Sequence, residues 1–85
     1  MNKELEVLEY LKHNTPAIGV SVIIKRIGIT RGEWEHARRS LMRRGFIEKI
    51  HVGRLTTYYV NLDRLDEIEK FMDERAKLRD ALKGE

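Results

Sequence analysis

Apolar residues in the first part of the chain recur at helical spacing. In residues 3–12 they form one stripe, made of Leu5, Val7, Leu8 and Leu11. A stripe of this kind predicts an amphipathic helix. After the break "HNTPAIG", the segment "VSVIIKRIG" repeats the pattern with Val20, Ile23, Ile24 and Ile27. It predicts a second, short helix with Ser21 as its candidate N-cap and Gly28 at its C-terminal end.

A three-residue connection, Gly28 to Thr30, separates this helix from the next. The sequence "TRGE" predicts a capping box, in which the Thr30 hydroxyl accepts from the Glu33 N–H and the Glu33 carboxylate accepts from the Thr30 N–H. The third helix is expected over 31–44. Gly45 suits the left-handed position just after its end.

Two runs rich in β-branched and aromatic residues follow, "FIEKIHV" and "TTYYVNL", with "GRLT" between them. They predict a β-hairpin with a short loop. Tyr58 and Tyr59 point to opposite faces of their strand, so one should pack and the other should be exposed. Asp63 is then expected to cap a last helix that runs to about Lys83.

The order helix, helix, tight turn, helix and hairpin resembles a winged helix-turn-helix domain of bacterial and archaeal transcription regulators. The segment that carries the resemblance is "VIIKRIGITRGEWEHARRSLMRRGFIEKIHVGRLTTYYV". The resemblance implies a mainly α fold with a β-hairpin (α+β), with a DNA-binding domain in residues 1–62 and a dimerisation helix in 63–85. It also implies that helix 31–44 enters the major groove and that the wing, residues 52–57, touches the minor groove or the backbone.

Helical geometry divides the third helix into faces. Trp34, Ala37 and Leu41 form the expected core stripe, whereas Arg39 and Arg43 lie opposite it. Arg38 stands at the core edge, where the family pattern usually has an aliphatic residue. It is expected to cover that edge, or to pair with Glu48 or an acidic residue of the last helix.

The resemblance and the charges together give a candidate DNA-binding set. Arg39 suits a bidentate contact to guanine, Glu35 suits cytosine, and Gly32 leaves room for close approach. Arg54 lies at the hairpin tip, where a guanidinium suits a narrow minor groove. The full set is Lys25, Arg26, Arg31, Gly32, Glu35, His36, Arg39, Arg43 and Arg54. The competing interpretation is a solvated face on which Glu35 pairs with Arg39 one turn later.

The last helix carries an apolar face that a domain of this size should not cover completely. The predicted interface residues are Leu65, Ile68, Phe71, Met72, Arg75, Leu78, Arg79 and Leu82. Their spacing is partly heptad-like, which favours pairing with a second copy of the chain. Antiparallel pairing is favoured because parallel helices would stack Arg75 and Arg79 against like charges. The alternative is that the helix folds back on its own domain.

Charge supports a polyanionic partner, because residues 21–60 contain nine basic and three acidic residues, a net charge of +6. The chain has no cysteine, and its three histidines lack ligand spacing, so neither a metal nor a cofactor is expected. The sequence shows neither a catalytic-triad pattern nor a phosphate-binding loop, so an enzyme is not expected. No signal peptide or membrane span is evident, which predicts a cytoplasmic protein. The lack of glutamine and the 36% of charged residues favour a thermophilic source.

Two other functions fit the same pattern. One is an architectural protein that binds DNA without sequence preference, and the other is a winged-helix module that binds proteins. Glu35 within an otherwise basic helix favours sequence reading. The prediction is therefore a homodimeric, sequence-specific DNA-binding protein, most simply a transcriptional regulator.

Overall fold

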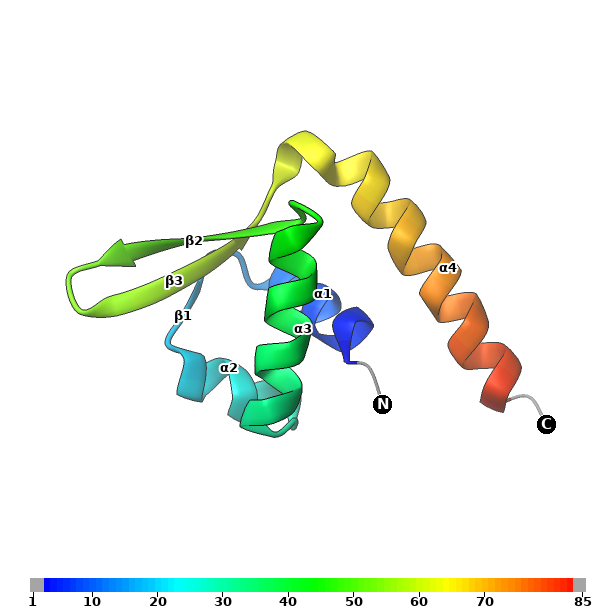
Figure 1. Ribbon diagram of the computed structural model, residues 1–85, viewed down its shortest axis with the longest axis horizontal. Coiled ribbons are helices and arrows are strands. Elements are labelled where there is room, and N and C mark those ends of the chain that lie inside the picture. Colours follow the sequence, from blue (N-terminus) through cyan, green and yellow to red (C-terminus); the bar gives the residue numbers. More distant parts are fainter. Residues whose placement is uncertain (1–2, 84–85) are drawn as a thin grey trace.

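The computed structural model describes residues 3–83. Its helices are α1 (Glu4–His13), α2 (Val20–Ile27), α3 (Arg31–Arg43) and α4 (Leu65–Lys83), and a 3-10 turn, η1 (Leu62–Arg64), precedes α4. The strands are β1 (Ala17–Ile18), β2 (Ile47–Val52) and β3 (Leu55–Val60), which form an antiparallel sheet in the order β1-β3-β2. In Figure 1 the β2–β3 hairpin extends to one side of the helices, and α4 runs away on the other side.

The hydrophobic core lies where α1, α3 and the sheet meet. Trp34, Ala37 and Leu41 are all buried, which confirms the core stripe predicted for α3. The Trp34 ring meets the Tyr58 ring edge to face, with 5.1 Å between their centroids. Tyr58 is therefore the inward tyrosine. Tyr59 is half-buried, and its hydroxyl donates to Glu48 at 2.7 Å.

The connection between α2 and α3 is built as the sequence predicts. Gly28 adopts φ +82°, a left-handed conformation in which a side chain would be strained. The capping box of Thr30 and Glu33 is present in both directions, at 2.9 and 3.1 Å. The predicted cap of α2 is wrong, because Gly19 occupies the N-cap position and Ser21 lies inside the helix. Gly28 therefore marks the end of α2, and the capping box marks the start of α3.

The hairpin is tighter than the sequence suggests. Strand pairing continues up to Val52 and Leu55, so the turn consists of Gly53 and Arg54 alone. Gly53 adopts φ +64°, as a two-residue hairpin turn requires. Arg54 consequently lies at the tip of a hairpin that is paired along its whole length.

Two features at the ends of the sheet differ from expectation. The short strand β1 was not predicted, and it pairs with β3 through Ala17 and Ile18. The cap predicted at Asp63 is also wrong: the Asn61 side chain accepts from the Asp63 N–H at 3.1 Å and starts η1, and α4 begins at Leu65. The amide oxygen of Asn61, directly before the turn, performs the function expected of the carboxylate.

The N-terminal half of α4 packs on its own domain. Ile68 and Phe71 belong to the core, and the Phe71 ring meets Phe46 edge to face at 5.4 Å. Guanidinium groups of Arg44 and Arg75 each lie 4.7 Å from the centre of the Phe71 ring. The alternative expectation, that the last helix folds back on its domain, therefore holds for this half. Within residues 3–83, no helix is long and apolar enough to cross a membrane.

Candidate nucleic-acid interface

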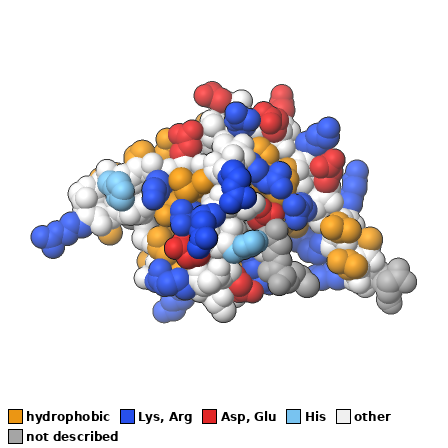
Figure 2. Space-filling model, viewed as in Figure 1, with side chains coloured by type: hydrophobic (Ala, Val, Ile, Leu, Met, Phe, Trp, Pro, Cys, Tyr) orange, Lys and Arg blue, Asp and Glu red, His pale blue; other side chains and the backbone are white. Residues whose placement is uncertain are grey.

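One face of α3 is basic and open to solvent. Gly32, His36, Arg39 and Arg43 are exposed, on the side of the helix opposite the buried Trp34 and Leu41. Neither Arg39 nor Arg43 forms an ion pair with any other residue in the described range 3–83. Figure 2 shows basic side chains gathered over the part of the molecule that α3 occupies. Their positive charge is therefore available to an external anion.

The last turn of α2 adds two further cations, because Lys25 and Arg26 are both exposed. Arg31 is exposed at the start of α3 and makes a long 3.5 Å contact to the Ser21 hydroxyl of α2. The tight turn after Gly28 places these residues at adjacent helix ends. The helix-turn-helix unit thus presents basic groups from both of its helices.

Glu35 pairs with Arg38 and not with Arg39, the partner that the solvated-face interpretation gives it. Its carboxylate accepts from Arg38 Nε at 2.7 Å, and both side chains are partly buried. This hydrogen bond holds the pKa of Glu35 below its ordinary value. The partners expected for Arg38 are therefore wrong: Arg38 pairs with Glu35, and Glu48 accepts from the Tyr59 hydroxyl instead. Arg39 in turn lacks the ion pair with Glu35 that the solvated-face interpretation requires.

The hairpin contributes Arg54, which is exposed at the two-residue turn. In Figure 2, blue atoms of a basic side chain project from the far end of the hairpin. The side of the hairpin that faces α3 also carries Lys49, an exposed residue that sequence analysis did not assign. Strand alternation could have found it, because Lys49 lies two residues after the buried Ile47 and so shares its face.

The predicted dimer interface is divided between the interior and the surface. Ile68 and Phe71 are buried within their own chain, so they cannot also contact a partner, whereas Leu78 and Leu82 are 58% and 72% exposed. Leu65 and Met72 are partly buried. The predicted interface residues that a second chain could contact therefore lie mainly in the C-terminal half of α4.

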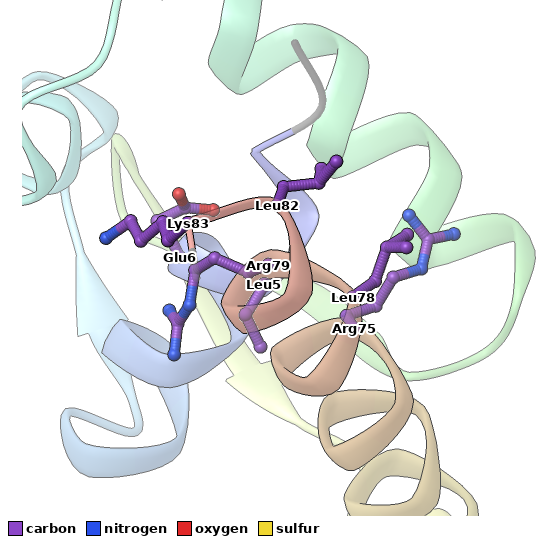
Figure 3. A pocket seen from close by; sticks show the side chains of 7 residues that line it. All are labelled: Leu5, Glu6, Arg75, Leu78, Arg79, Leu82 and Lys83. Carbon is purple, nitrogen blue, oxygen red and sulfur yellow. The ribbon is translucent and has the colours of Figure 1, made fainter. Parts of the chain in front are cut away.

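A groove separates that half of α4 from the start of α1. It has a volume of about 380 Å³, and Leu5, Leu78 and Leu82 give it apolar walls (Figure 3). Arg75 and Arg79 also line it, but they pair with Glu4 at 3.4 Å and Glu9 at 3.8 Å, respectively. Neither arginine then needs an acidic residue of a partner helix, and the electrostatic reason for preferring antiparallel pairing is removed.

The described residues contain no group of three or more His, Asp or Glu side chains arranged to hold a metal ion. The exposed basic residues offer charge and hydrogen bonding, chiefly through guanidinium groups. Guanidinium groups bind phosphates and the guanine edge in a planar, bidentate geometry.

Comparison with known proteins supports the fold. No model of a protein family matches the chain, and no curated protein matches it in sequence. Among solved structures, the fold is similar to that of the PcaV transcriptional regulator from Streptomyces coelicolor, solved in complex with its natural ligand, with a TM-score of 0.75. The identity is 18%, and the match covers 96% of this chain but 60% of PcaV. The chain thus has a winged helix-turn-helix fold, mainly α with a β-hairpin.

Proposed function

We propose that this protein binds double-stranded DNA with sequence preference, as a homodimer, and acts as a transcriptional regulator. The observation that carries the proposal is the exposed basic face of α3, whose Arg39 and Arg43 have no ion-pair partner within residues 3–83. Opposite charges three or four residues apart on a helix attract each other, so a solvated basic face would be expected to use such pairs. Here the acidic residue at that spacing, Glu35, is bound to Arg38 instead. The proposal assigns a binding role and no catalytic step.

The residues of α3 suit two kinds of contact. Gly32, His36 and Arg39 lie within the first nine residues of the 13-residue helix. The N-terminal part of such a helix reaches base edges when it enters the major groove. Arg39 would donate two hydrogen bonds to guanine O6 and N7. Arg43, one turn further on, would bind a phosphate, as would Lys25 and Arg26 at the end of α2.

Arg54 would contact the adjacent minor groove, because the paired hairpin carries it beyond the body of the domain. Glu35 remains a candidate for base reading, with its carboxylate already held by Arg38. A carboxylate in that position can accept a hydrogen bond from cytosine N4. The fixed Glu35–Arg38 pair supports selectivity among sequences more than it supports affinity.

The homodimer is supported by the apolar side chains at the C-terminal end of α4. Leu78 and Leu82 are largely exposed, and exposing a large apolar side chain forfeits about 1.5–3 kcal/mol of burial free energy. A second copy would supply its own Leu78 and Leu82 to the groove beside α1 and would cover both pairs at once. The two α3 helices of such a dimer would read half-sites about 34 Å apart.

The proposal can be tested with a charge-matched pair of double variants. Arg39→Ala/Arg43→Ala should weaken binding to a duplex selected for high affinity at least 100-fold, because it removes one base contact and one phosphate contact. Lys70→Ala/Lys77→Ala removes the same charge from exposed positions of α4 and should change affinity less than threefold.

Each alternative function predicts a different result. An architectural protein would bind selected and random duplexes equally well and would lose affinity for both to the same extent. A protein-interaction module would bind DNA no better than other cationic proteins, and the two double variants would then behave alike. Either result would contradict sequence-specific recognition by α3.

A further inference from the structure

A polar hollow lies between α3 and the hairpin, and it brings Arg31 and Glu35 of the predicted DNA-binding set together with Arg38 and Lys49, which lie outside that set. It has a volume of about 190 Å³. Arg31, Glu35 and Arg38 line it from α3, Lys49 lines it from β2, and Tyr58 lines it from β3. Three of these side chains are cationic and one is anionic, so the hollow carries a net charge of 3 − 1 = +2. Such an excess favours an anionic occupant.

The positive groups of the hollow have spare hydrogen-bonding capacity. Lys49 forms no ion pair within the described part of the chain, and Arg31 makes only the long contact to Ser21. Arg38 uses Nε for Glu35 and Nη1 for the sulfur of Met42, which leaves Nη2 without a hydrogen bond among residues 3–83. Each of the three cations can therefore donate to a ligand.

The backbone determines where these donors point. Lys49 lies opposite Tyr58 in the β2–β3 register, and Tyr58 packs on Trp34 of α3. Lys49 therefore projects from the face of the hairpin that is turned toward α3. Arg31, Glu35 and Arg38 follow one another at helical spacing along the side of α3 nearest the hairpin. The hollow lies between the helix and the wing.

We propose that this hollow binds a phosphate of the DNA backbone, through Lys49, Arg38 and Arg31. The inference rests on the proposed function. When a helix occupies the major groove and a hairpin tip occupies the neighbouring minor groove, the sugar-phosphate strand that separates the two grooves has to pass between helix and hairpin. In this protein that passage is the position of the hollow.

Glu35 acts as a positioning residue in this site. Its 2.7 Å hydrogen bond fixes the Arg38 guanidinium against the wall formed by Trp34 and Tyr58, so that less side-chain entropy is lost when the phosphate binds. With Nε bound to the carboxylate and Nη1 to the Met42 sulfur, Nη2 remains to donate to the ligand. A phosphate in this position would fix the register of the duplex relative to both reading elements.

Lys49→Ala is the most direct test, because Lys49 is exposed and its removal should leave the core intact. Binding of a fluorescent generic duplex is measured at several salt concentrations for the wild type, Lys49→Ala, Lys49→Arg and the α4 control Lys70→Ala. Log affinity falls with log salt, and in Lys49→Ala this fall should be shallower by about 0.9 for each hollow that engages the duplex. Lys49→Arg should keep the wild-type slope, and so should Lys70→Ala.

The two proposals fail in different ways. If the wild type binds with a steep salt dependence and Lys49→Ala keeps that slope, no phosphate lies in the hollow, although DNA binding stands. If the wild type itself does not bind the duplex, both proposals are overturned. If the salt dependence becomes equally shallow in Lys49→Arg and in Lys49→Ala, that result would also contradict a phosphate contact, because arginine supplies the same charge as lysine.

Discussion

The carboxylate of Glu4, in the first turn of α1, lies 3.4 Å from the guanidinium of Arg75 in α4. Glu4 is 2% exposed, and it also accepts from the Ser40 hydroxyl of α3 and lies 3.9 Å from Arg44, just after α3. One buried carboxylate therefore connects three helices. Because of this connection, α4 is anchored near its middle to the domain that α1 and α3 help to form, and it is not a detachable appendage.

Replacing Glu4 should destabilise the whole domain. Breaking a wholly buried ion pair costs about 3–5 kcal/mol, but Arg44 and Arg75 keep access to water, so we expect Glu4→Ala to lower the free energy of unfolding by about 2 kcal/mol. Urea denaturation of Glu4→Ala against Glu74→Ala, an exposed control on α4, measures the difference. Equal stability of the two variants would show that the three-helix contact contributes nothing.

The capping box of α3 should give stability a dependence on acidic pH. The hydrogen bond from the Thr30 backbone N–H lowers the pKa of Glu33 from its ordinary value of 4.5. Because the pKa is lower in the folded state, the contribution of Glu33 is fully present above pH 4.5 and is lost as the pH falls through the folded value. Glu33→Gln should thus be less stable than the wild type at pH 7, with a gap that narrows below about pH 4. A gap of constant size in urea denaturation across this range would exclude the ionised cap as its cause.

Arg39 should read a base. We expect Arg39→Ala to weaken binding to the preferred sequence by about 1–3 kcal/mol and to relax selectivity at one base pair. Arg43→Ala serves as the comparison, because loss of a phosphate contact should weaken binding to all duplexes alike. The measurement is competition of selected and single-substituted duplexes for each variant. A uniform loss for Arg39→Ala would reassign Arg39 to the backbone.

The homodimer should depend on the exposed end of α4. Leu78→Asp/Leu82→Asp places two charges where apolar contact is proposed and should yield a monomer in analytical ultracentrifugation, with the fold retained. Truncation of α4 is a poorer test, because it would also remove Ile68 and Phe71 from the core. Unchanged sedimentation of the double variant, at a concentration where the wild type is a dimer, would place the interface elsewhere. A monomeric wild type would contradict the homodimer itself.

The elements that could be predicted are those with a strong local signal. The α3 start follows from four residues, because the side chains of Thr30 and Glu33 satisfy each other's backbone. The core face of α3 follows equally from spacing. By contrast, a strand as short as β1 has no periodicity to detect, and it forms only because β3 offers an edge.

The candidate site could be predicted only in part, for a related reason. Helical spacing shows that Ile68 and Phe71 will be buried, but it does not show whether their own chain or another covers them. Spacing likewise pointed to Arg39 as the partner of Glu35, whereas the structure pairs Glu35 with Arg38, three residues on, beside the hollow that Trp34 and Tyr58 help to line. Lys49 was missed because its role depends on the hairpin lying beside α3, which is a tertiary relationship.

DNA binding itself is tested most directly by fluorescence anisotropy of the wild-type protein titrated onto a labelled generic duplex at several salt concentrations. If the exposed arginines of α3 face DNA, log affinity will fall linearly with log salt. The slope will have a magnitude of about 0.9 for each phosphate neutralised, and it should correspond to several phosphates. Little or no binding even at low salt would contradict DNA binding. The basic face of α3 would then be a solvated surface.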